Sequence, residues 1–432
     1  MTLPRVVGAE HAVPLIDGRT IAYANLDHAA SAPCLTAVRA AVDELLPWYA
    51  GVHRGAGFPS RVSTRVYERA RTTLRRFVGA PDDAAVVFTR NTTDSMNLLA
   101  SAVPAGSRVV LFDTEHHAAL LPWRDAHRLR TPEVAADAVG VLDRALRERA
   151  AALVVLTGAS NVTGEVWPVA ALAEVAHRHG ARVVLDAAQL APHRPVDAAA
   201  LGVDYVALSG HKLYAPFGAG ALVGPADWLR AAEPYLVGGG ATKLVADGFA
   251  VTWSDAPARH EAGSPNVVGV HALAAACEAL AGSWDAVVAH EEALLERMRT
   301  GLAHVPGLRE LALFEPGHDR VGVVSFTVDG IDPGLAAAVL SAEHGIGVRD
   351  GAFCAHVAVR RLAEGGQAVR ASVGLGTAAE HVDRLGRALR LLVARGPRAR
   401  YEVVDGRWSP VPDPRPLPRF LADGAGPWTM AG

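Results

Sequence analysis

Lysine is nearly absent from this chain. Only two lysines, Lys212 and Lys243, occur in 432 residues, so almost all of the 42 basic side chains are arginine. A guanidinium stays protonated and does not act as an amine nucleophile, whereas a lysine with a lowered pKa can form a Schiff base with a carbonyl compound. The stretch YVALSGHKLYAP (205–216) therefore indicates a lysine kept for its chemistry. A compositional bias against lysine, with two accidental survivors, is the alternative explanation.

Cysteine is also scarce. Cys34, Cys277 and Cys354 lie far apart and form no CxxC motif. This spacing argues against a disulfide framework or a structural zinc site, and it suits a reducing compartment. Cys34 and Cys277 lie in helix-like surroundings, so we assign both to packing. We expect a cytoplasmic protein without a metal centre.

Long apolar runs and an excess of charge of either sign are missing as well. No apolar run approaches the roughly 18 residues of a membrane-spanning helix, and the first residues lack the apolar segment of a signal peptide. The formal net charge is −3, with the charged residues scattered along the chain. We therefore expect neither a membrane nor a nucleic acid as a partner.

Short β-branched runs alternate with longer amphipathic segments between about residues 84 and 224. This alternation is typical of strands that helices connect in a mostly parallel sheet. The segment 168–180 has a proline near its start and a closing glycine, which predicts a helix. The predicted strands are AAVVFTR (84–90), RVVLFD (108–113), AALVVLTG (151–158), ARVVLDAA (181–188), DYVALSG (204–210) and GALVG (220–224).

The pattern changes after residue 238. A glycine-opened excursion or hairpin is predicted at 238–253, and the later predicted elements are a helix at 284–305, a strand at 321–328, and helices near 334–344 and 380–396. We divide the chain into an N-terminal segment (1–20) packed on the small domain, a large domain (21–280), a smaller α+β domain (281–396) and a Pro/Gly-rich extension (397–432). The extension either packs on the surface or is loose.

Polar residues follow the predicted strands, where ligands bind in an open parallel sheet. RNTTD (90–94) places the hydroxyls of Thr92 and Thr93 at the start of a predicted helix, which favours phosphate binding. Helix capping is the alternative role of these threonines. His116 and His117 follow another strand, where a histidine stacks on a ring, shuttles a proton or is structural.

Asp186 ends the apolar run ARVVLD, where a carboxylate needs a cation or hydrogen-bond donors. A protonated heterocyclic nitrogen is one such cation, while a capping role is the alternative. An aldehyde-accepting lysine, a carboxylate for a ring nitrogen, a phosphate site and a stacking histidine together predict pyridoxal 5′-phosphate as the cofactor.

These motifs carry a family resemblance, which runs from LDHAAS to about residue 395. The chain resembles fold-type I pyridoxal-phosphate enzymes of the class V aminotransferase group, most of all type II (sulfur-mobilisation) cysteine desulfurases and selenocysteine lyases. The matching segments are LDHAAS (26–31), VHRG (52–55), TEHHA (114–118), SNVTG (160–164), LDAAQ (185–189), SGHKLY (209–214), EAGSPN (261–266), VRDGAFCA (348–355) and RASVG (370–374). The resemblance implies an α/β fold with a mostly parallel seven-stranded sheet, a smaller α+β C-terminal domain and an obligate homodimer.

The resemblance also implies how the cofactor is held. Lys212 would attach it through a Schiff base, Asp186 would pair with the pyridinium nitrogen, and Gln189 would hydrogen-bond the phenolic oxygen. His116 would stack on the ring and exchange protons, and Asn161 would help to hold ring and substrate. The residues implied for the phosphate are Thr92, Thr93, Ser209 and His211, with Ser264 reaching the phosphate in the partner subunit.

The implied reaction converts L-cysteine to L-alanine. Arg370 would clamp the substrate carboxylate, with Arg349 and Arg54 as further polar residues around the substrate. Cys354 would take the sulfur as a persulfide, which a sulfur-acceptor protein could then receive. A small buried hydrophobic role is the alternative for this cysteine.

The chain departs from the family pattern in two places. Ala352 and Phe353 stand where many members carry two histidines, and Leu375 and Gly376 replace a Tyr-Asn pair before Thr377. The alternatives to a desulfurase are therefore a carbon–sulfur β-lyase, an epimerase or an aminotransferase of the same fold. A non-catalytic dimeric scaffold is the alternative of another class.

Overall fold

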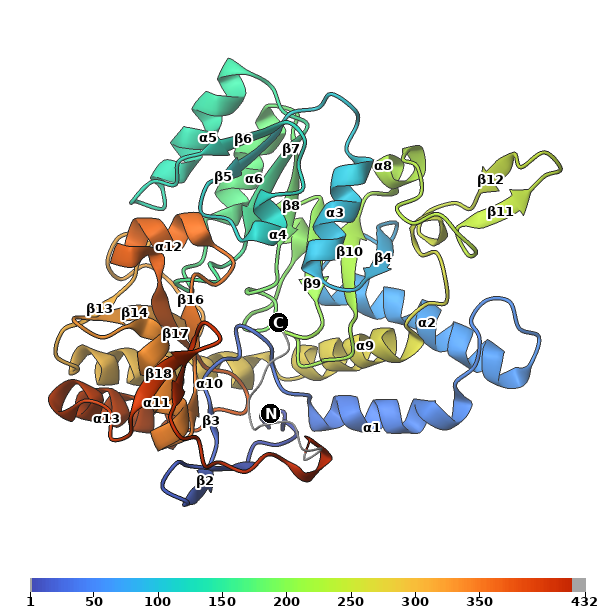
Figure 1. Ribbon diagram of the computed structural model, residues 1–432. Coiled ribbons are helices and arrows are strands. Elements are labelled where there is room, and N and C mark those ends of the chain that lie inside the picture. Colours follow the sequence, from blue (N-terminus) through green and yellow to red (C-terminus); the bar gives the residue numbers. More distant parts are fainter. Residues whose placement is uncertain (1, 422–432) are drawn as a thin grey trace.

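The computed structural model describes residues 2–421 and centres on a seven-stranded sheet (Figure 1). The strand order is β4-β10-β9-β8-β7-β5-β6, and β10 runs antiparallel to both of its neighbours while the remaining pairs are parallel. The mostly parallel sheet predicted from the sequence is confirmed. The strands are β4 (Ala85–Thr89), β5 (Val109–Phe112), β6 (Ala126–Leu129), β7 (Leu153–Thr157), β8 (Arg182–Asp186), β9 (Tyr205–Ser209) and β10 (Gly220–Gly224).

Strand β6 has no counterpart among the segments predicted from the sequence. It lies at the edge of the sheet, where it pairs only with β5 among the described strands. Its residues His127 and Arg128 are exposed. An edge strand buries less surface, so the apolar pattern that marks the other strands is missing here.

Side chains alternate between the two faces of the sheet, and each face packs against a layer of helices. In β4, Val86 and Phe88 join one buried cluster, whereas Val87 joins the other. The first cluster includes α1 (Thr36–Leu45), α2 (Phe58–Phe77), α5 (Asp137–Glu148), α6 (Val169–Arg178) and α9 (Val267–Ala281). The second includes α3 (Thr92–Ala102), α4 (His117–Leu120) and α8 (Ala226–Ala231).

A separate core lies C-terminal to α9. Phe326, Leu340 and Leu389 are fully buried in it, and Leu26 joins them from the N-terminal part. Its sheet has the order β13-β14-β17-β16. The elements are α10 (Trp284–Ala303), β13 (Leu308–Glu310), β14 (Val323–Val328), α11 (Pro333–His344), β16 (Arg349–Gly351), α12 (His356–Leu362), β17 (Ala368–Ser372) and α13 (Ala379–Arg395). The domain boundaries at residues 20, 280 and 396 stay predictions.

The N-terminal strands lie against this second core. A hairpin of β1 (Ala12–Pro14) and β2 (Thr20–Ala22) precedes β3 (Ala24–Asn25), which runs parallel to β15 (Ile346–Gly347). The backbone N–H of Ile16 donates to the carbonyl of Ala342 at 3.0 Å. This pairing fixes the segment that leads into LDHAAS and hence into the pocket described below.

The C-terminal extension also packs on α11. Residues 401–410 form a hairpin of β18 (Tyr401–Val404) and β19 (Arg407–Pro410). Glu343 of α11 is 2% exposed and accepts hydrogen bonds from Arg398 Nε at 2.9 Å and from the Tyr401 hydroxyl at 3.3 Å. Of the two alternatives for this extension, surface packing therefore holds for residues 401–410. Residues 422–432 lie outside the described part of the chain.

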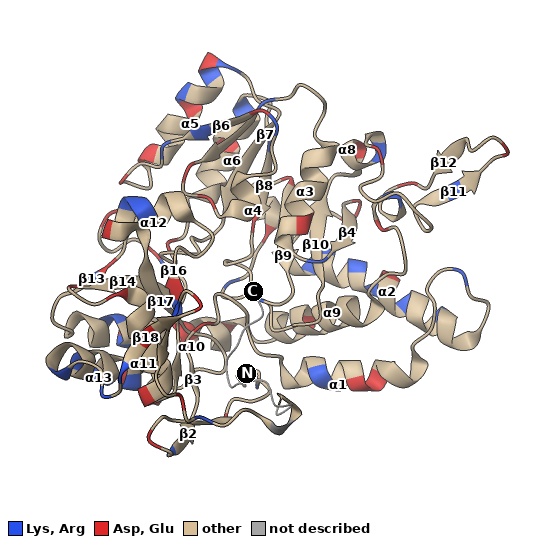
Figure 2. Cartoon of the chain, in the orientation of Figure 1, with Lys and Arg blue, Asp and Glu red and all other residues tan. Residues whose placement is uncertain are grey.

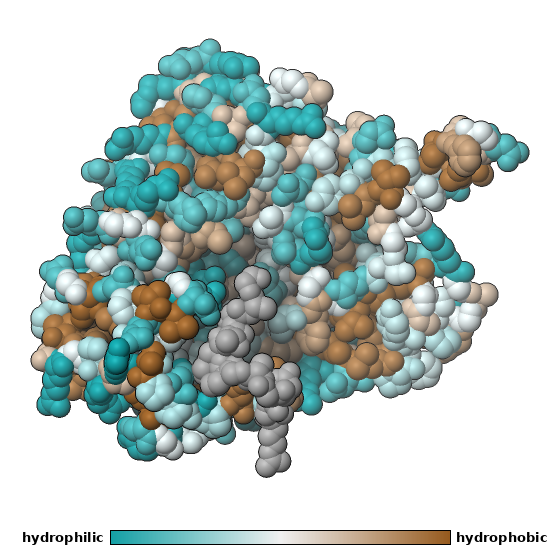
Figure 3. All heavy atoms as spheres, in the orientation of Figure 1, coloured by the Kyte–Doolittle hydropathy of each residue, from teal (hydrophilic) through white to brown (hydrophobic). Residues whose placement is uncertain are grey.

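One hairpin stands away from the body, as Figure 1 shows. It consists of β11 (Thr242–Val245) and β12 (Val251–Trp253), within the segment where a hairpin was predicted. Its apolar side chains are exposed, with Phe249 at 87% and Leu244 at 59%, and they form a brown patch in Figure 3. Charged residues of both signs are scattered over the other outer elements (Figure 2).

Among the described residues, no single helix is both long enough and apolar enough to cross a membrane. The pair α9 and α10 meets the criteria of length and composition only when taken together, and the two are bent by 81°. Most apolar side chains of α9 are buried in the core.

Candidate active site

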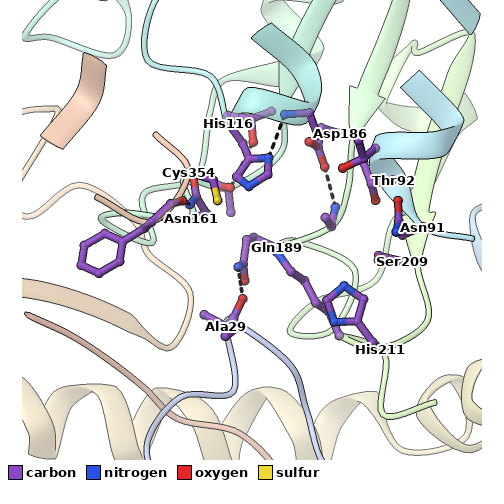
Figure 4. Close-up of a pocket in the computed structure, with 18 of the residues that line it drawn as sticks. Ala29, Asn91, Thr92, His116, Asn161, Asp186, Gln189, Ser209, His211 and Cys354 are labelled. Atoms are coloured by element: carbon purple, nitrogen blue, oxygen red, sulfur yellow. Dashed lines mark hydrogen bonds between the residues drawn. The ribbon is translucent and has the colours of Figure 1, made fainter. Parts of the chain in front are cut away.

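One pocket collects the predicted site residues at the carboxyl ends of the central strands (Figure 4). Asp186 ends β8 and Ser209 ends β9, and Lys212 follows three residues later. Arg370 enters from β17 of the second core. All predicted site residues line the pocket except Arg54 and Ser264: Thr92, Thr93, His116, Asn161, Asp186, Gln189, Ser209, His211, Lys212, Arg349, Cys354 and Arg370.

The start of α3 forms one wall. Asn91 caps this helix, because its side-chain oxygen accepts a hydrogen bond from the backbone N–H of Asp94 at 3.1 Å. The cap is therefore not provided by Thr92 or Thr93. A Cβ on Gly220 would lie 2.8 Å from Asn91 Cα, so glycine permits this close approach of β10. The hydroxyl of Thr92 is buried and has no hydrogen-bond partner among the described residues.

Lys212 and Asp186 are the central charged pair of the pocket. Burial lowers the pKa of Lys212 to about 8, although the nearby Asp186 carboxylate works in the opposite direction. Burial also raises the pKa of Asp186, whose Oδ1 accepts one hydrogen bond from the backbone N–H of Ala188 at 3.0 Å. A lysine with a pKa near 8 is roughly one-tenth neutral at pH 7, far more than an ordinary lysine, and the neutral amine is the nucleophilic form.

His116 is held as a neutral imidazole. It caps the short helix α4, where its Nδ1 accepts a hydrogen bond from the backbone N–H of Ala118 at 3.1 Å. Burial and the neighbouring Lys212 lower the pKa of His116 to about 3. With Nδ1 used as an acceptor, the ring proton belongs on Nε2.

Arg370 is a buried guanidinium whose Nε has no hydrogen-bond partner among the described residues. Nη1 donates to the carbonyl of Asn161 at 2.9 Å and Nη2 donates to Asp27 Oδ1 at 3.2 Å. Asp27 also faces Arg349, with 3.9 Å between Asp27 Oδ2 and Arg349 Nη1. The free Nε can donate to an incoming carboxylate.

Cys354 is the exposed cysteine of the three. It follows β16, and both it and Phe353 adopt left-handed backbone conformations, with φ of 54° and 52°. Burial raises the pKa of Cys277 and of Cys34. The alternative in which Cys354 is a buried hydrophobe does not hold, whereas the packing roles predicted for the other two agree with their burial.

The donor set fits pyridoxal 5′-phosphate. Among the described residues, Thr92 Oγ1, Ser209 Oγ and Gln189 Oε1 are buried polar atoms without a partner. The Thr92 hydroxyl at the start of α3 and the Ser209 hydroxyl at the end of β9 suit a phosphate, since the N-terminus of α3 also contributes backbone N–H groups. The Gln189 amide nitrogen already donates to the carbonyl of Ala29 at 2.7 Å, which leaves Oε1 for the cofactor. Buried polar atoms usually have a hydrogen-bond partner in the protein, in water or in a ligand, so these three are available to a cofactor in this pocket.

Two predicted residues lie elsewhere. Arg54 and Ser264 are exposed and do not line the pocket of their own chain, so their substrate and phosphate roles stay predictions. Asp27 and Phe353, for which the sequence predicted no role, both contact Arg370. A carboxylate that follows the apolar Leu26 and precedes a run of mostly small residues (29–31) is the signal that could have marked Asp27, since similar reasoning marked Asp186.

The model of the family "Aminotransferase class-V" matches residues 24–385. The chain belongs to the class-V aminotransferase family. A cysteine desulfurase from Dickeya dadantii is 36% identical over 386 residues, covering 86% of this chain and 91% of that protein. The apo structure of a cysteine desulfurase from Thermococcus onnurineus has a TM-score of 0.79 at 30% identity, covering 91% of this chain and 100% of that one.

Another solved relative is the cysteine desulfurase CsdA (S-sulfonic acid) from Escherichia coli. It has a TM-score of 0.76 at 32% identity and covers 86% of this chain and 95% of its own. These relatives place the class-V chain in the fold-type I architecture that the resemblance implied.

Proposed function

We propose that the protein is a pyridoxal 5′-phosphate-dependent cysteine desulfurase. The observation that carries the proposal is the joint position of Lys212, Arg370 and Cys354 on one pocket. An amine with a lowered pKa, a free guanidinium donor and an accessible thiol are the groups that this reaction requires. Relatives of 35–36% identity that are named cysteine desulfurase support it.

The cofactor would be held by groups that the chain leaves without partners. Lys212 would bind its aldehyde carbon, and Asp186 would face the ring nitrogen. Thr92, Thr93, Ser209 and His211 would surround the phosphate. When bound, the cofactor supplies an electron sink that stabilises negative charge at the substrate Cα.

The proton step falls to Lys212, and His116 serves as a hydrogen-bond donor. The Lys212 amine, with its lowered pKa, would serve as the base that removes the α-proton of the bound amino acid. His116 is neutral, so its Nε2–H would donate a hydrogen bond to a polar atom in the pocket and orient it without changing charge. Arg370 would meanwhile hold the substrate carboxylate through Nε.

The sulfur step requires no external oxidant. The Cys354 thiolate attacks the substrate sulfur, an S–S bond forms and the substrate C–S bond breaks, with its electron pair passing to the carbon fragment. Protonation of that fragment at Cβ and Cα gives L-alanine. Enzyme thiol and L-cysteine therefore become enzyme persulfide and L-alanine in balance.

Product analysis tests the proposal directly. The purified holoenzyme is incubated with L-cysteine and a thiol reductant, and alanine and sulfide are measured. We expect equal amounts of both, and we expect Cys354→Ala to lose on the order of a hundredfold in alanine formation while its coenzyme absorbance stays unchanged. Pyruvate and ammonia, with full activity in Cys354→Ala, would select the β-lyase instead. No alanine from cysteine or selenocysteine would exclude a desulfurase.

We also propose a homodimer with shared active sites. Ser264 is exposed outside its own pocket, which agrees with a role in a second subunit. The hairpin β11–β12 carries exposed Leu244, Val245 and Phe249, an apolar surface that a second copy would cover. Light scattering should give about twice 45.2 kDa for the wild type. A monomeric, fully active enzyme would contradict the shared site.

The same proposal includes a reducing compartment, the cytoplasm, because the three cysteines are unpaired. An exposed Cys354 would be accessible to a sulfur-acceptor protein. Transfer of radiolabelled sulfur from the loaded enzyme to a thiol acceptor tests this last step.

A further inference from the structure

Phe353 touches the two functional groups that the proposed reaction brings together. Its ring centroid lies 5.0 Å from the Arg370 guanidinium carbon, within the range of a cation–π contact. It is also the residue immediately before Cys354. The ring is 6% exposed and packs in a small cluster with Val162 and Val359.

The backbone around Cys354 is held in an unfavourable conformation. Phe353 and Cys354 are consecutive non-glycine residues with φ near +50°, a region that side chains with a Cβ rarely adopt. A strained pair persists only where surrounding contacts fix it. Asn161 Nδ2 donates to the Phe353 carbonyl at 2.7 Å, and the His117 backbone N–H donates to the Cys354 carbonyl at 2.8 Å.

These contacts close a triangle. The backbone carbonyl of Asn161 accepts a hydrogen bond from Arg370, and its side-chain amide donates a hydrogen bond to the backbone carbonyl of Phe353. Phe353 in turn covers the Arg370 guanidinium with its ring. Asn161 and Phe353 therefore contact both the Arg370 guanidinium and the backbone next to the Cys354 thiol. Arg370 lies on β17, whereas Cys354 follows β16.

We propose that Phe353 is a positioning residue, which holds the Arg370 guanidinium and the Cys354 segment in one arrangement. The aromatic face limits where the guanidinium can lie, so the substrate carboxylate binds at a fixed distance from the thiol. The inference deepens the proposed function and rests on it for the substrate, but not for the coupling between Arg370 and Cys354.

The test compares four variants of the holoenzyme. Phe353→Met keeps an apolar side chain of similar volume and removes the ring, Phe353→Leu is a second ring-free variant, and Phe353→Tyr keeps the ring. Phe314→Met is the matched control, because Phe314 is 5% exposed and contacts Trp167 edge to face. Thermal unfolding selects the variants that fold.

Two quantities are measured. The first is KM and kcat for L-cysteine, and the second is the rate at which iodoacetamide alkylates Cys354 without substrate, followed by peptide mass spectrometry. For the ring-free variants we expect KM to rise about three- to tenfold and the alkylation rate to change at least about threefold. Phe353→Tyr and Phe314→Met should stay within about twofold of the wild type.

Ring-free variants that match the wild type in both quantities would overturn the inference, as would equal changes in Phe314→Met. Alkylation needs no turnover, so this result is separable from the proposed function. If the enzyme forms no alanine, the affinity for L-alanine, titrated through the absorbance of the bound coenzyme, replaces KM. If the enzyme forms no alanine but the alkylation rate still changes in the ring-free variants, the proposed function is contradicted and the positioning role of Phe353 is not.

Discussion

Asp27 Oδ1 accepts a hydrogen bond from Arg370 Nη2 at 3.2 Å, although the two residues lie 343 positions apart in the chain. Arg370 is buried and Asp27 is its negatively charged partner. A substrate carboxylate that reaches Arg370 therefore meets a guanidinium that is already paired with one carboxylate, that of Asp27. The balance between these two carboxylates sets the affinity for the substrate.

Replacing Asp27 by asparagine should strengthen substrate binding. Asparagine keeps the oxygen that accepts from Arg370 and removes the competing charge, so we expect KM for L-cysteine to fall about three- to tenfold. Steady-state kinetics measure this change. Asp350→Asn, one residue along β16 from Arg349, is the charge-matched control and should leave KM within about twofold. A rise in KM would mean that Asp27 instead holds Arg370 in its binding conformation.

The buried hydroxyl of Thr92 predicts a trade between stability and binding. Because this hydroxyl has no partner among the described residues, Thr92→Val should raise the unfolding free energy of the apoprotein by about 1 kcal/mol. It should also weaken pyridoxal 5′-phosphate binding about tenfold. Thermal unfolding with and without the coenzyme measures both effects.

Thr93→Val separates these two effects. Thr93 is exposed, so its substitution should weaken coenzyme binding without raising the unfolding free energy of the apoprotein. Loss of apoprotein stability in Thr92→Val would show that the hydroxyl has a protein partner.

The lowered pKa of Lys212 predicts how capture of the coenzyme depends on pH. The neutral amine is the reactive form, and its fraction grows as the pH rises through the pKa of about 8. The rate of pyridoxal 5′-phosphate uptake by the apoenzyme should therefore be half-maximal near pH 8 and level off at higher pH. Stopped-flow absorbance between pH 6 and 10 follows this rate.

Asp186→Asn sharpens the same experiment. The Asp186 carboxylate raises the pKa of Lys212, so its neutralisation should move the midpoint to lower pH. A wild-type midpoint near 10, the ordinary value of an exposed lysine, would contradict the buried position of Lys212.

The sequence predicted those parts of the fold and site that local patterns specify. Asp186 and Ser209 end apolar runs, and the carboxyl ends of parallel strands meet at one edge, so their convergence with Lys212 could be foreseen. Strand β6 could not, because an edge strand with exposed His127 and Arg128 lacks the apolar signature of its neighbours.

Contacts between segments far apart in the chain could not be predicted from local sequence patterns. The pair of Asp27 with Arg370 and the ring of Phe353 over the same guanidinium depend on how the second core docks on the first. Capping was the alternative role for Thr92 and Thr93, whereas the structure gives the cap to Asn91, the residue before them. The packing of residues 401–410 on Glu343 likewise depends on tertiary contacts that the Pro/Gly-rich composition does not reveal.

The most direct test of the account is reductive trapping at Lys212. The holoenzyme is treated with borohydride, digested and examined by mass spectrometry, alongside Lys212→Arg and Lys243→Arg. Lys243 is the other lysine of the chain and is exposed on β11, which makes it a matched control. We predict a pyridoxyl phosphate adduct on Lys212 in the wild type and in Lys243→Arg, and none in Lys212→Arg. An unmodified Lys212 in the presence of excess coenzyme would contradict the account.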